Sequence, residues 1–148
     1  MYSVQEFLWL PMKTLLVPKK DPALQKEFYG REGDIKYAGV HLLAELWHSR
    51  YLEDAVKIRS ILIKAIDACG ATMLSIDLHT FSPNGGISGV AVLKESHISI
   101  HTWPELEYAA VDVFVCGRID PHSVVDLLKA EFQPDRIEVT EVKRGIFS

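Results

Sequence analysis

The run "AVLKESHISIHTWPE", residues 91–105, contains side chains that could carry out chemistry. Ser96 supplies a hydroxyl, His97 and His101 supply imidazoles, and Glu95 supplies a carboxylate. Cys116, at the end of the next apolar run, adds a thiol. Hydroxyl and thiol groups can act as nucleophiles when a base activates them, and imidazole also binds metals. These residue types therefore raise three possibilities: metal binding, nucleophilic hydrolysis and self-processing of the chain.

Metal binding would use His79, His97, His101 and Cys116, because imidazole and thiolate are ligands that zinc prefers. These residues are scattered over several predicted strands, and no close-spaced cysteine pair accompanies them. We therefore expect no metal site.

Nucleophilic hydrolysis is poorly supported, because "GISG" at residues 86–89 is not the G-x-S-x-G elbow and no strand-to-helix turn surrounds it. A plainer alternative is that the histidines occupy a solvated face of a sheet. The polar residues cluster around the apolar "GVAVL" and a Trp-Pro pair, which weakens that alternative.

In self-processing, the Ser96 hydroxyl would attack the Glu95 carbonyl carbon and turn the peptide into an ester. Composition alone does not select this third possibility.

Alternating polarity predicts the elements that position these residues. Strands are expected at residues 37–47, 71–81, 90–94, 97–102, 108–116 and 136–142, and helices at residues 52–69 and 121–131. Strands outnumber helices, and several consecutive strands have short connections. The order predicts an α+β two-layer sandwich, with a mostly antiparallel sheet and two helices on one face.

Within these strands, parity assigns side chains to faces. Ile98 shares one face with Ile100, whereas His101 lies on the opposite face, where Cys116 of the following strand is also expected. Alternation places Ser96 on the Ile98 side, away from His101. The chain must therefore depart from regular strand geometry at residues 95–96, as strained backbone at a functional site does.

Size and charge limit the classes of function. The 148 residues suit one domain, and we place an N-terminal extension at residues 1–35 and the domain at residues 36–148. A net charge of −4 argues against nucleic acid as a partner. Two cysteines make no disulfide framework, which favours the cytoplasm. Pro11 and Lys13 interrupt the N-terminal apolar patch, so neither a membrane span nor a signal peptide is expected.

Several motifs together resemble one family. "GISGVAVLKESHISIHTWPE" followed by "YAAVDVFVCG" resembles the bacterial short form of S-adenosylmethionine decarboxylase, a pyruvoyl-dependent enzyme. The segments "HLLAELW", "CGATMLSIDLHTFSPNGGISG" and "DRIEVTEVKRG" also match that family in order and spacing. The resemblance runs from about residue 40 to residue 145.

The resemblance implies roles for individual residues. Ser96 would become the pyruvoyl group when the chain is cleaved after Glu95, giving a β chain of residues 1–95 and an α chain of residues 96–148. His101 and Ser88 match residues that promote this processing, and Cys116 matches the general acid of decarboxylation. Three further positions match substrate-binding residues: Phe81 and Trp103 against the adenine ring, and Glu105 on the ribose hydroxyls.

The implied activity is release of carbon dioxide from S-adenosylmethionine, through a Schiff base between the substrate amine and the pyruvoyl carbonyl, to supply spermidine synthesis. The family also implies a homodimer of cleaved protomers. One departure is Glu107, which stands where the family commonly has glycine. One alternative on the same scaffold is an arginine or ornithine decarboxylase, in which the Glu107 carboxylate would meet the cation at the far end of the substrate side chain. A second alternative is an unprocessed, non-enzymatic homologue.

Overall fold

A computed structural model describes residues 29–117 and 119–147. Within this part of the chain, seven strands and two α-helices follow one another. The strands are β1 (Gly30–Glu32), β2 (Ile35–Trp47), β3 (Met73–Thr80), β4 (Ile87–Leu93), β5 (Ser96–Trp103), β6 (Tyr108–Cys116) and β7 (Arg136–Phe147). The helices are α1 (Ala55–Cys69) and α2 (His122–Phe132), and a short 3-10 turn, η2 (Pro104–Leu106), joins β5 to β6.

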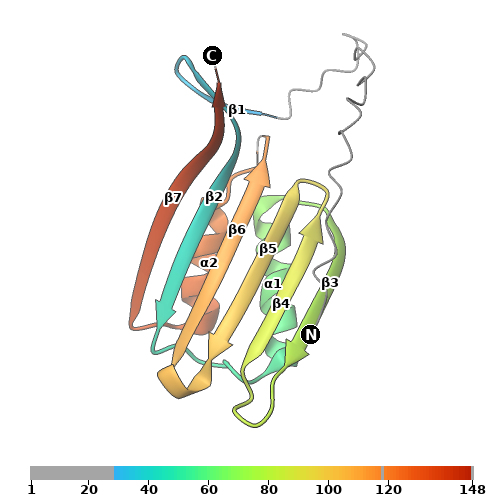
Figure 1. Cartoon of the computed structure of the whole chain (residues 1–148), viewed down its shortest axis with the longest axis vertical. Coiled ribbons are helices and arrows are strands. Elements are labelled where there is room, and N and C mark those ends of the chain that lie inside the picture. The colour runs from blue at the N-terminus through green and yellow to red at the C-terminus, as the bar shows by residue number, and fades with distance from the viewer. Residues whose placement is uncertain (1–28, 118, 148) are drawn as a thin grey trace, which may run out of the picture.

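The strands form one antiparallel sheet in the order β1-β2-β6-β5-β4-β3, and β7 also pairs with β2. Both helices lie on the same face of this sheet, and the opposite face carries no helix of the described residues (Figure 1). The predicted α+β sandwich is confirmed. We call the side of the sheet opposite α1 and α2 the open face.

Local signals explain where α1 begins and ends. The Asp54 carboxylate accepts the backbone N–H of Lys57 at 2.8 Å, which satisfies one of the free donors of the first turn. Gly70 ends the helix with a φ of 72°, a left-handed conformation that glycine adopts without a steric penalty. Both ends follow from residue types that sequence reasoning can recognise.

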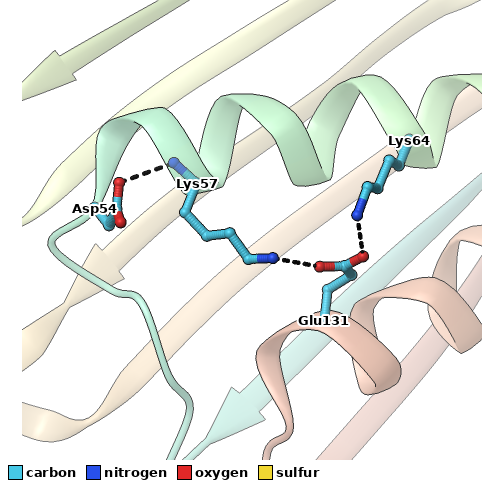
Figure 2. A network of polar contacts seen from close by, with 4 residues as sticks. All are labelled: Asp54, Lys57, Lys64 and Glu131. Carbon is cyan, nitrogen blue, oxygen red and sulfur yellow. Dashed lines mark hydrogen bonds and ion pairs between the residues drawn. The ribbon is translucent and has the colours of Figure 1, made fainter.

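The second helix is tied to the first by charged side chains. The Glu131 carboxylate of α2 accepts Lys57 Nζ at 2.7 Å and Lys64 Nζ at 2.5 Å, both from α1 (Figure 2). These contacts lower the pKa of Glu131. Pro121 is the N-cap residue of α2, and the Asp120 carboxylate accepts the His122 N–H at 2.9 Å.

The core lies between the helices and the sheet. Ile98 and Ile100 of β5 and Val111 and Val113 of β6 are buried, together with Leu62 of α1. The residues between them along each strand reach the open face, as the alternation predicts. Burial of apolar area stabilises the fold by roughly 25 cal/mol per Å². It orients the apolar side chains of β5 and β6 toward the helices and leaves the alternate side chains accessible on the open face.

Several boundaries differ from those predicted. Strand β2 begins at Ile35 and follows the short strand β1, which the sequence did not indicate. Strand β4 begins at Ile87, and β7 continues to Phe147 because its last residues pair with the start of β2. The predicted extension, residues 1–35, falls largely on residues 1–28, which lie outside the described residues. The boundary at residue 35 stays a prediction.

Candidate active site

Ser88 and His101 lie together on the open face. They are register partners on β4 and β5, and Ser88 Oγ lies 2.8 Å from His101 Nδ1. A hydroxyl hydrogen-bonded to an imidazole can pass a proton to or from it. This pair is therefore suited to proton transfer at a group placed beside it.

A cavity of about 580 Å³ opens next to this pair. Its walls come from the β3–β4 loop and the end of β5: Phe81, Ser82, Pro83, Asn84, Gly86, Ser88, His101, Thr102 and Trp103. Thr102 fixes one wall, since its hydroxyl donates to the Leu52 carbonyl at 2.7 Å and accepts the Ile87 N–H at 2.8 Å. Asn84 Nδ2 is 3.4 Å from each Glu105 carboxylate oxygen. The cavity thus offers aromatic and polar groups with a carboxylate nearby.

Trp103 belongs to a column of stacked rings. Its centroid is 5.2 Å from that of Tyr108, which is in turn 4.4 Å from that of Trp47. The Arg136 guanidinium carbon lies 5.1 Å from the Trp47 centroid. The Tyr108 hydroxyl donates to the Glu45 carboxylate. Burial and this contact raise the pKa of Tyr108 to about 12. Tyr108 therefore stacks against one face of the Trp103 ring.

Glu107, the departure noted in the sequence, ends the η2 turn in a left-handed conformation with φ 51°. Its carboxylate contacts His48 Nδ1 at 2.9 Å. It lines a separate cavity of about 640 Å³, formed with residues of the segment before α1, and not the cavity beside Trp103. The additional carboxylate therefore faces a different space from the one that Phe81 lines.

The second group of predicted residues lies at the junction between Glu95 and Ser96. The Glu95 carbonyl oxygen accepts the backbone N–H of Cys116 at 3.0 Å. Ser96 has a φ of 151°, a region that costs a residue with a side chain about 1–3 kcal/mol. The irregular geometry expected from the strand alternation is present. The Glu95 carboxylate also accepts the Thr72 N–H at 2.9 Å, which anchors this turn.

The two groups do not meet within one chain. Ser96 and His101 lie on the same regular strand, five residues apart, which at about 3.3 Å per residue separates their Cα atoms by about 17 Å. Cys116 lies at the Ser96 end, beyond the register pair of Ser96 with Val115. His101 and Cys116 share a face, as predicted, but lie at opposite ends of the sheet.

The remaining histidines take other positions. The His79 ring lies 4.6 Å from that of Phe81. His97 follows Ser96 on β5 and lies beside Phe114 and His41. No group of three or more His, Cys, Asp or Glu side chains in residues 29–117 and 119–147 is arranged to hold a metal ion. Across the same residues, no helix is long and apolar enough to cross a membrane.

Sequence reasoning missed two participants at this end of the sheet. Asn84 in the β3–β4 loop contacts Glu105, and Tyr108 stacks on Trp103. An Asn beside two glycines reads as a turn residue, and a Tyr that begins a strand reads as a packing residue. Neither carries a local signal of a site, because both contacts depend on strand pairing.

Comparison with known proteins identifies the family. The sequence profile described as "S-adenosylmethionine decarboxylase" matches residues 40–145. The chain belongs to the S-adenosylmethionine decarboxylase family.

Individual relatives agree with this assignment. "S-adenosylmethionine decarboxylase proenzyme" of Methanococcus maripaludis (strain C5) is 48% identical over 115 residues, covering 76% of this chain and 93% of the relative. The protein of the same name from Thermomicrobium roseum is 41% identical over 113 residues, covering 76% and 97%. The crystal structure of the adenosylmethionine decarboxylase from Aquifex aeolicus VF5 is similar with a TM-score of 0.67, at 36% identity over 76% of this chain and 94% of that one.

Proposed function

We propose that this protein decarboxylates S-adenosylmethionine, giving the aminopropyl donor for spermidine synthesis, after it cleaves itself between Glu95 and Ser96. The observation that carries the proposal is the geometry of this junction in a member of the S-adenosylmethionine decarboxylase family. A proenzyme name among the relatives fits a chain that must mature.

Maturation begins with attack of the Ser96 hydroxyl on the Glu95 carbonyl carbon. Negative charge then develops on the Glu95 oxygen, and the Cys116 N–H already lies 3.0 Å from that atom. A backbone donor aimed at a developing oxyanion stabilises it most where the donor is fixed beforehand. The strained φ of Ser96 adds ground-state energy that cleavage releases.

The residues at this junction fit a pyruvoyl group. Elimination from the ester frees Glu95 as a carboxylate, and hydrolysis of the remaining enamine releases ammonia and leaves a ketone at position 96. Such a carbonyl supplies an electrophile for the substrate amine and an acceptor for the electrons released with carbon dioxide. Cys116 is the general acid in this proposal, because its partly exposed thiol stands at the same end of the sheet.

Substrate binding is assigned to the cavity at the other end. Phe81 and Trp103 offer aromatic faces for adenine, and Glu105 offers acceptors for the ribose hydroxyls. Aromatic faces also attract the positive sulfonium. Arginine and ornithine have no group for these contacts. Glu107, whose carboxylate would have to meet their distal cation, is bonded to His48 and lines the other cavity, so the amino-acid alternative is not favoured.

We further propose that the active unit is a homodimer with shared sites. Ser88 and His101 lie about 17 Å from Ser96 of the same chain and cannot reach it. A two-fold axis through paired open faces would bring the Ser96 end of one protomer to the His101 end of its partner, twice per dimer. Each site would then hold Ser96 and Cys116 of one protomer and His101 of the partner subunit.

The open face has the character of an interface. One row across the sheet consists of Val92, His97, Phe114, His41 and Val142, of which Val92 and Val142 are 40% and 42% exposed. Partly exposed aromatic and apolar side chains on a sheet face suit a contact surface. A second copy of the chain is the occupant that also completes the site. Location in the cytoplasm stays a prediction from cysteine usage.

Two measurements test the proposal. On denaturing gels and by mass spectrometry, the purified protein should separate into residues 1–95 and 96–148, the second without a free N-terminal amine, and Ser96→Ala should remain one chain. Carbon dioxide release should be seen with S-adenosylmethionine and not with arginine or ornithine. Turnover of an amino acid alone would overturn the substrate, and an intact, inactive wild-type chain would favour the non-enzymatic alternative.

A further inference from the structure

Two non-glycine residues with left-handed backbone face each other at the corner of the sheet beside the substrate cavity. His48, directly after β2, has a φ of 56°, and Glu107, directly before β6, has a φ of 51°. Residues with a Cβ avoid this region, and such strain persists where surrounding contacts over-determine it. Two such residues in contact indicate that specific interactions hold this corner of the sheet in place.

The contacts between them are specific. His48 Nδ1 lies 2.9 Å from a Glu107 carboxylate oxygen, and the Ser49 N–H donates to the Glu107 carbonyl at 3.1 Å. The Glu107 N–H in turn donates to the Pro104 carbonyl at 3.0 Å, which closes the η2 turn. The end of β2 therefore holds the last residue of the turn that carries Glu105.

The same strand end also holds the turn from its other side. Trp47 stacks on its register partner Tyr108, and Tyr108 stacks on Trp103, the residue before the turn. Residues 47 and 48 thus reach both flanks of η2. Glu105 itself has few contacts, with Asn84 Nδ2 at 3.4 Å, so its place depends on the backbone of the turn.

We propose that Glu107 is a positioning residue for the nucleoside subsite, acting through the hydrogen bond between its carboxylate and His48 to fix the turn that presents Glu105. The inference rests on the proposed function, since Glu105 is the acceptor assigned to the ribose hydroxyls. An ordered turn presents its carboxylate without the entropy cost of immobilising it on binding, which is how preorganisation raises affinity. The replacement of glycine at this position thereby strengthens substrate binding instead of obstructing it.

The size of the effect follows from exposure. The His48 and Glu107 side chains are 56% and 68% exposed, so the pair is a solvent-screened one. Such pairs contribute a fraction of 1 kcal/mol to about 1 kcal/mol, which corresponds to a change in affinity of about two- to fivefold.

The test compares His48→Gln, Glu107→Gln and the double variant with the wild-type enzyme. KM for S-adenosylmethionine and Kd for adenosine, followed by tryptophan fluorescence, should rise together by about two- to fivefold, with kcat and the rate of Ser96 cleavage unchanged. The double variant should match the singles, because either change removes the same pair. His48→Lys, which offers the Glu107 carboxylate an ammonium donor, should restore affinity.

Glu32→Gln is the matched control, because Glu32 is a similarly exposed carboxylate, paired with Lys143 at the opposite end of β2. It should leave KM and Kd unchanged. Unchanged KM and Kd in both single variants, or additive effects in the double, would overturn the positioning role. A wild-type enzyme that releases no carbon dioxide from S-adenosylmethionine would instead overturn the proposed function, and adenosine binding would still report on the pair.

Discussion

A mixture of two inactive chains should cleave itself if the site is shared between protomers. Ser96→Ala removes the nucleophile at one end of β5, and His101→Ala removes the proton-transfer partner at the other end, about 17 Å away. In a mixed dimer the Ser96→Ala chain still supplies an intact Ser88 and His101. One of the two sites is then complete, and the Ser96 it acts on belongs to the His101→Ala chain.

The expected yield follows from this geometry. When equal amounts of two chains pair at random, about half of the dimers are mixed, and each mixed dimer has one complete site of two. About a quarter of all chains, and about half of the His101→Ala chains, should therefore be cleaved. The Ser96→Ala chains should stay intact.

The assay is co-expression of the two variants with different affinity tags, followed by denaturing electrophoresis and mass spectrometry of each tagged chain. Ser88→Ala with His101→Ala is the matched control. Both of these changes fall in the same half of each site, so no mixed dimer contains a complete one, and no cleavage above that of either variant alone is expected. Absence of cleavage in the first pair, with mixed dimers demonstrated by tandem purification, would refute the shared site.

Three further outcomes test other parts of the structure. Cys116→Ala should still mature, since it keeps the backbone N–H that contacts the Glu95 carbonyl oxygen. Its decarboxylation should be severely slowed or give misprotonated product. Clean, full turnover by this variant would show that another group is the general acid. Glu105→Gln should lower kcat/KM for S-adenosylmethionine by about tenfold, at 1.4 kcal/mol per decade for the loss of a charge-assisted hydrogen bond, and an unchanged value would exclude Glu105 from ribose binding. The pKa of Tyr108 is raised from 10 to about 12 in the folded protein. The stability that the protonated Tyr108 hydroxyl contributes is therefore complete below pH 10 and is lost as the pH rises toward 12. Over that range, the denaturant midpoint of Tyr108→Phe should fall less steeply than that of the wild type.

Much of the candidate site could be proposed from the sequence because its signals are local. The Glu95–Ser96 junction and the Cys116 position lie in a continuous motif, and alternation in β5 correctly separated Ile98 and Ile100 from His101. The same alternation indicated that regular geometry must break at Ser96, where the φ of 151° is found. These predictions required only the two-residue period of a strand.

Predictions that depended on proximity were less complete. Parity placed His101 and Cys116 on one face, but only the register of β5 with β6 set them at opposite ends of it. Strand β1 and the last residues of β7 carry weak signals of their own and are defined by pairing with β2. Pairing between distant segments is set by the packed core, which no local window contains.

The sequence by itself therefore determined the family, the α+β class and the residue types available for chemistry, because motifs and periodicity are properties of neighbouring positions. The tertiary structure alone decided that Ser88 meets His101, that the Cys116 N–H meets the Glu95 carbonyl, and that Glu107 meets His48. It also separated the two halves of the site along one strand, a distance that follows from the rigid rise of a strand in a sheet. That separation is why we propose that a second copy of the chain supplies the other half of the site.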